Sequence, residues 1–96
     1  MAEKEQLRQM VSGMHVHLLS LDGLYDSAMK CLAHTEEAFA AAITNAKMHG
    51  EALSEVERQR YTALVQEARE NVSISARARE AFHLKLRQLE ERIAKL

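Results

Sequence analysis

Apolar side chains recur through the first half of the chain at alternating steps of four and three residues. Eleven of the thirteen positions in this series are apolar or aromatic; they are Leu7, Val11, Met14, Leu18, Leu21, Tyr25, Ala28, Leu32, Thr35, Phe39, Ala42, Ala46 and His49. This heptad spacing forms one stripe on an α-helix that packs lengthwise against another helix. It predicts a long first helix at about residues 5–49.

The second half carries a similar series with one irregularity. Its members are Tyr61, Leu64, Ala68, Val72, Ser75, Arg79, Phe82, Leu86, Leu89, Ile93 and Leu96. Two consecutive steps of four, from Leu64 to Ala68 to Val72, form a stutter, which locally unwinds a coiled coil. Residues 71–75 are also weak helix formers. We therefore expect a second helix at about 55–95 with a kink at 71–75.

Signals between the two series predict a tight turn at 50–54. Gly50 can adopt the left-handed conformation that closes a helix. Ser54 and Glu57 have the spacing of a capping box, which begins a new helix. A connection this short usually joins antiparallel neighbours, and it would bring Phe39 against Leu64.

The composition supports an all-α fold in a single domain, residues 1–96. The chain has no proline, three glycines and fifteen alanines, which leaves little turn chemistry for several strands. A second set of uncharged residues widens the apolar face beyond what one neighbouring helix covers: Met10, Leu24, Cys31 and Ala38. We predict a long antiparallel helical hairpin that pairs into a four-helix bundle.

A competing fold places a turn at residues 20–23. Together with a break at 71–75, this turn would let the chain fold back into a compact four-helix monomer. The first heptad series keeps its phase through Gly13 and Gly23, although a glycine inside a helix costs about 1 kcal/mol relative to alanine. The unbroken phase favours one long helix.

The charge balance argues against a dedicated nucleic-acid binder, because the formal net charge is only -1. Residues 1–54 carry four basic and seven acidic side chains, whereas residues 55–96 carry nine and seven, which favours packing one half against the other. A single cysteine fits a reducing cytoplasm. No apolar run is long enough for a membrane span, so we expect a cytoplasmic protein without a membrane partner.

Two short motifs resemble parts of metal sites. Glu80 and His83 have a Glu-x-x-His spacing, but a di-iron bundle needs two such motifs. Cys31 and His34 supply only two of the four ligands of a zinc site, and we expect Cys31 to be a small buried side chain. No nucleophile elbow or phosphate loop is present. We predict no enzyme activity, no catalytic residue, no metal and no cofactor.

Arg79 occupies a position where the second series calls for an apolar side chain. In the expected hairpin it lies opposite Tyr25, with Asp22 and Asp26 in reach. An ionised group in an apolar seam can specify register or partner at a cost in stability.

These features favour a protein–protein interaction module, such as a small helical chaperone, an assembly subunit or a regulatory adaptor. It would bury an amphipathic helix of a partner or of its own copy, so a homodimer is expected. The anchors predicted for binding are Leu18, Tyr25, Leu32, Phe39, Leu64, Phe82 and Leu86. The layout looks like that of small helical-hairpin export chaperones in shape only, because no motif assigns a family.

An alternative function is a small nucleic-acid-associated regulator. It would use the basic second helix, whose cations are Arg69, Arg77, Arg79, Lys85, Arg87, Arg92 and Lys95. Acidic residues interleave with these cations, so an ordinary solvated helix face accounts for most of them. Nucleic acid is therefore the less favoured partner.

Overall fold

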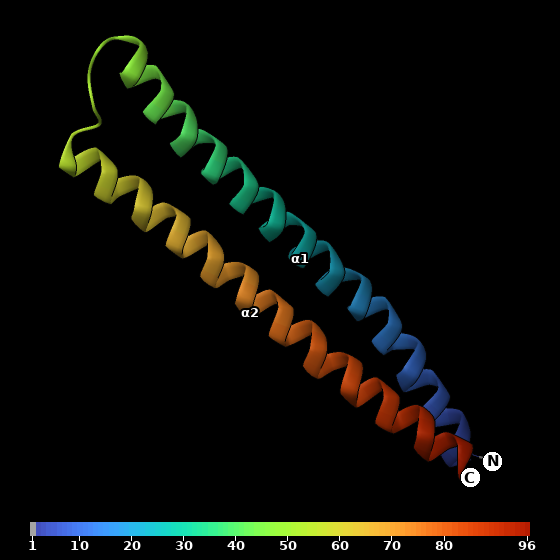
Figure 1. The fold of residues 1–96 in the computed structure, drawn as a ribbon. Coiled ribbons are helices and arrows are strands. Elements are labelled where there is room, and N and C mark those ends of the chain that lie inside the picture. The colour runs from blue at the N-terminus through green and yellow to red at the C-terminus, as the bar shows by residue number, and fades with distance from the viewer. Residues whose placement is uncertain (1) are drawn as a thin grey trace. The chain divides into compact units, whose positions relative to one another are not determined.

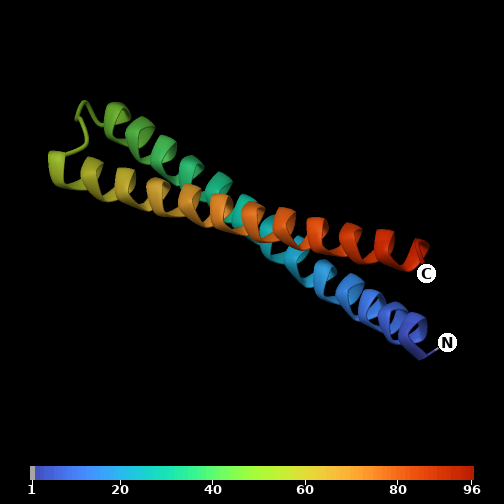
Figure 2. The same cartoon turned by 90° about the horizontal axis from the view of Figure 1, so that it is seen from below.

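The structure, a computed structural model, describes residues 2–96 and contains two α-helices and no strand in that range. Helix α1 spans Ala2–Met48 and helix α2 spans Glu55–Ala94. Each helix is an uninterrupted coil in both views (Figure 1 and Figure 2). The prediction of an all-helical chain with two long helices is confirmed.

The end of α1 is closed by the glycine that the sequence singled out. Gly50 has a φ of 71°, and its N–H donates to the Lys47 carbonyl at 3.0 Å. The Glu51 N–H donates to the Ala46 carbonyl at 2.9 Å. This pair of hydrogen bonds is a Schellman motif, which satisfies two carbonyls that a helix end leaves free.

Helix α2 begins as the capping signal predicts. The Glu57 N–H donates to the Ser54 hydroxyl at 3.2 Å, and the Arg58 N–H donates to the Ser54 carbonyl at 2.9 Å. The serine half of the capping box is therefore formed. Together with Gly50, it confines the connection to a few residues.

Neither of the two expected weak points breaks a helix. Gly23 lies inside α1 without a positive φ, and residues 71–75 continue α2. The compact four-helix monomer required breaks at both places, so that alternative is wrong. A break at 71–75 is likewise contradicted.

Contacts within the described chain separate it into two compact units. Unit 1 combines the start of α1, up to Tyr25, with Ser75–Leu96, and unit 2 is Asp26–Ile74. Unit 2 is a helical hairpin closed by the turn after Met48. In α2 the boundary falls inside the stretch of weak helix formers at 71–75.

The partners in unit 1 run in opposite order along its two segments, which makes the pair antiparallel. Glu3 contacts Arg92, His15 contacts Glu90, and Asp22 contacts Arg79; these are its three ion pairs. Both units therefore consist of antiparallel helical segments.

The heptad series of α1 forms the buried side of that helix. Every member from Leu7 to Ala46 is buried or half-buried, and only His49 is exposed. The core is nonetheless thin. Within residues 2–96 the buried hydrophobic side chains are Leu7, Leu18, Ala68 and Leu86, and none of these is completely enclosed.

The buried series of α2 differs from the sequence prediction at one position. Val65 is half-buried and Leu64 is 45% exposed, so the steps run from Tyr61 through Val65 to Ala68. The predicted stutter at Leu64 is wrong, because the seam keeps regular heptad spacing through Val65. Phe39 accordingly stacks on Tyr61, with ring centroids 5.3 Å apart, and the expected pairing with Leu64 is replaced.

Two glycine substitutions should change stability in opposite directions. An added Cβ meets open space at both positions, but Gly50 has a left-handed φ and Gly23 is helical. Gly23→Ala should raise the free energy of unfolding by about 0.5–1 kcal/mol. Gly50→Ala should lower it by about 1–2 kcal/mol. Urea denaturation at one fixed protein concentration measures both, and equal effects of the two substitutions would contradict the turn described above.

Candidate interaction surface

One exposed face of α1 carries no Asp, Glu, Lys or Arg over most of the helix. Its residues follow heptad steps of three and four, and all are exposed. We call them the α1 stripe: Met10, Gly13, His17, Ser20 and Leu24 in unit 1, and Ser27, Cys31, His34, Ala38, Ala41 and Asn45 in unit 2. Charged residues make up 28% of the chain, so an ordinary solvated face of this length would carry several.

The other flank of α1 shows the expected solvated character. Its heptad positions include five charged side chains, which are Arg8, Asp22, Asp26, Glu36 and Lys47. The two flanks of the same helix thus differ in charge, although both border the same seam. The side chains of the α1 stripe therefore interact less favourably with water than those of the other flank.

Each unit also exposes apolar side chains of other positions. In unit 2, Leu64 and Ile74 of α2 are 45% and 63% exposed. In unit 1, Met10, Met14 and Leu89 line an open groove of about 430 Å³. Lys85 and Arg92 also line this groove and supply its positive charges. Methionine side chains adapt to varied partner shapes, which suits such a groove to helix binding.

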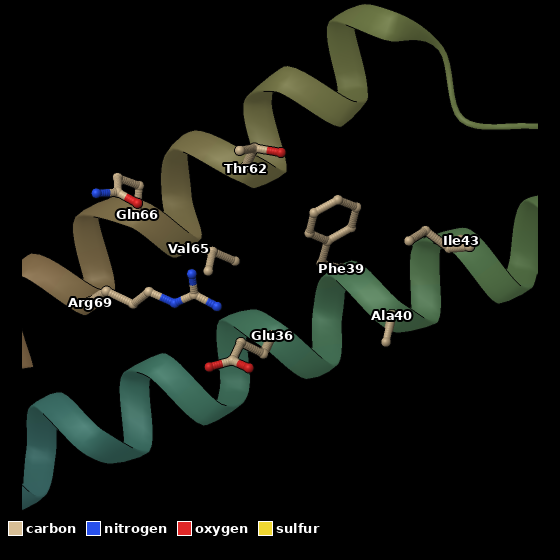
Figure 3. A pocket seen from close by; sticks show the side chains of 8 residues that line it. All are labelled: Glu36, Phe39, Ala40, Ile43, Thr62, Val65, Gln66 and Arg69. Carbon is tan, nitrogen blue, oxygen red and sulfur yellow. The ribbon is translucent and has the colours of Figure 1, made fainter.

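A second groove lies in unit 2 and has charged ends. It has a volume of about 370 Å³ and is lined by apolar Phe39, Ile43 and Val65. Figure 3 shows Glu36 and Arg69 at one end of this groove and Ile43 toward the other. Side chains of both signs around an apolar floor make this site more polar than the α1 stripe.

A polar layer interrupts the apolar seam of unit 1. Arg79 Nε lies 2.8 Å from Asp22 Oδ1, and the Arg79 guanidinium carbon lies 4.9 Å from the centre of the Tyr25 ring. The predicted placement of Arg79 opposite Tyr25 is confirmed. Asp22 Oδ1 is enclosed and accepts no hydrogen bond from the described residues, so the ion pair with Arg79 balances its charge.

The other ion pairs of unit 1 lie in solvent. His15 Nε2 is 3.4 Å from Glu90 Oε1, and Arg92 is 3.7 Å from Glu3; all four side chains are more than half exposed. Pairs of this kind contribute little to stability. The His17 and Phe82 rings, 4.8 Å apart, add an aromatic contact at the edge of the seam.

Most of the anchors predicted from the sequence lie in the intrachain seam. Leu18 and Leu86 are buried, and Leu64 is exposed. The remaining four are half-buried, namely Tyr25, Leu32, Phe39 and Phe82. Their role in binding a partner stays a prediction. The sequence did contain the signal for the exposed face, because Met10, Leu24, Cys31 and Ala38 are uncharged and lie at intervals of seven residues or a multiple of seven.

The candidate metal ligands do not gather into a larger cluster. Cys31 and His34 are both exposed, so the expectation of a buried cysteine is wrong for the single chain. Glu80 and His83 line a small groove of about 190 Å³ beside Tyr25. Across residues 2–96, no three His, Cys, Asp or Glu side chains are grouped closely enough to hold a metal ion.

Neither α1 nor α2, as described, has an apolar stretch that could cross a membrane. The chain matches no protein-family model, no curated protein and no solved structure. Its candidate function therefore rests on the residues themselves.

The contact between Asp22 and Arg79 can be tested with a double-mutant cycle. Arg79→Leu should lower the free energy of unfolding by about 0.5–1 kcal/mol, because it leaves the enclosed Asp22 oxygen without its partner. Adding Asp22→Ala should recover most of this loss.

Arg77→Leu is the matched control, because Arg77 is exposed on the same helix and should change stability by less than about 0.5 kcal/mol. Urea denaturation of the wild type, Arg79→Leu, Asp22→Ala and the double variant gives the coupling energy. Strictly additive effects would show that the two side chains do not depend on each other.

Proposed function

We propose that this chain is a protein–protein interaction module that buries an amphipathic helix of a partner or of its own copy. The observation that carries the proposal is the α1 stripe, which is exposed yet carries no Asp, Glu, Lys or Arg, whereas the opposite flank of the same helix carries five charged side chains. Exposed large apolar side chains within it, Leu24 at 61% and Met10 at 54%, support the same conclusion.

The mechanism is the burial of one helix in the groove between others. A helix with apolar residues at matching heptad steps would lie along the α1 stripe and remove both surfaces from water. Each square ångström of apolar surface buried in this way contributes about 25 cal/mol. Small residues such as Gly13, Ser20 and Ala41 would let the partner's backbone approach closely.

Within this proposal the chain acts in the cytoplasm, as a small chaperone, an assembly subunit or a regulatory adaptor. An exposed, unpaired Cys31 on the binding face supports a reducing compartment, because oxidation there would compete with helix binding. The activity is recognition, and the described side chains supply it through apolar contacts.

Light scattering at several protein concentrations, combined with purification from the native host, tests the proposal. We expect a mass above that of one chain, or a defined helical protein that co-purifies. Because apolar burial drives the association, it should persist between about 0.1 and 0.5 M salt. Binding through contacts to phosphate groups would instead weaken steeply over this range. A monomer without any bound protein at every concentration would contradict the proposed function.

A further inference from the structure

We propose that the partner covering the α1 stripe is a second copy of this chain, packed stripe to stripe in a homodimer. This inference rests on the proposed function and specifies its partner and its binding face. It assigns the α1 stripe, and not the charged-ended groove of unit 2, as the contact surface.

The α1 stripe lies one residue before each seam position from Val11 to Ala46, so a helix can follow it along the whole length of the seam. From Met10 to Asn45 the steps alternate strictly between three and four residues, as they do in the seam that α1 buries within the chain. A helix with two heptad faces in phase packs between neighbours on both sides. Helix α2 covers one face, and a helix with the same period fits the other.

The exposed area agrees with a dimer. The chain exposes 7413 Å². A compact protein of 10.9 kDa exposes about 5,600 Å² by the usual scaling of area with mass. The surplus of about 1,800 Å² per chain exceeds the roughly 800 Å² per partner that a stable interface of standard size buries, so the chain exposes enough surface for a dimer contact.

The charge pattern favours a copy over an unrelated partner. A two-fold interface brings the same patch of both chains together, so the patch must be complementary to itself. The α1 stripe satisfies this requirement because it holds no Asp, Glu, Lys or Arg to repel its counterpart. The opposite flank carries charges of both signs (Arg8, Asp22, Asp26, Glu36 and Lys47), and each would have to find a partner of opposite sign or lose contact with water in such an interface.

Two matched pairs of substitutions test this face. Leu24→Glu alters the stripe, whereas Leu19→Glu places the same charge on the other flank at 71% exposure, compared with 61% for Leu24. Ala38→Glu and Ala40→Glu form the second pair, because Ala40 lines the charged-ended groove. Sedimentation equilibrium measures the dimer dissociation constant, and far-UV circular dichroism follows the helices.

We expect Leu24→Glu and Ala38→Glu to weaken dimerisation about 100-fold or more, because each buries charge on both sides of the interface. Leu19→Glu and Ala40→Glu should change it less than about threefold. Leu24→Ala introduces no charge and favours the helix, and it should weaken the dimer about tenfold through lost apolar contact.

Several results would overturn the inference. One is a dimer that tolerates Leu24→Glu and Ala38→Glu but is lost in Ala40→Glu, which would place the contact in the groove of unit 2. Another is a wild-type monomer that carries a different protein, which would leave the proposed function standing without the homodimer. A monomer with no partner would remove both.

Discussion

The structure depends on one constraint: each heptad seam can be covered by only one neighbouring helix. Helix α2 covers the seam of α1, and the resulting core contains few buried side chains within the described residues. Ordering a chain costs about 1–2 kcal/mol per residue in backbone entropy. A core this thin therefore leaves little net stability. The second, uncharged face of α1 supplies the apolar surface that can offset this cost when another helix covers it.

The polar layer of unit 1, formed by Asp22, Tyr25 and Arg79, specifies how the two helical segments align. An apolar seam with uniform heptad spacing tolerates a shift of one helical turn at little cost. Arg79 paired with Asp22 and stacked on Tyr25 makes such a shift unfavourable, because it would separate the charges. Since both charged side chains remain partly exposed, the layer fixes alignment more than it adds stability.

The sequence predicted α1 in detail and α2 less well, for physical reasons. Heptad spacing and the Gly50 signal are local, so the seam of α1 and the turn followed directly. Leu64 and Val65 are both apolar, but regular steps of four and three lead from Tyr61 through Val65 to Ala68, so unbroken periodicity favours Val65 and the larger Leu64 is misleading. A different limit applies to the candidate site: periodicity identifies a packing face, but whether the chain itself covers that face depends on tertiary contacts. Periodicity therefore favours seam residues such as Leu18 and Phe39 as anchors over the exposed residues of the stripe.

The most direct test of the account is the reactivity of the Cys31 thiol, which lies on the α1 stripe and is exposed in the single chain. Its rate of modification by a soluble disulfide reagent should be compared in the native protein and in the urea-unfolded chain. If a second copy covers the stripe, the native thiol should react at least about tenfold more slowly, and protection should decrease on dilution as dimers dissociate. A native thiol that reacts as fast as the unfolded one, at a concentration where two chains are associated, would contradict the central claim.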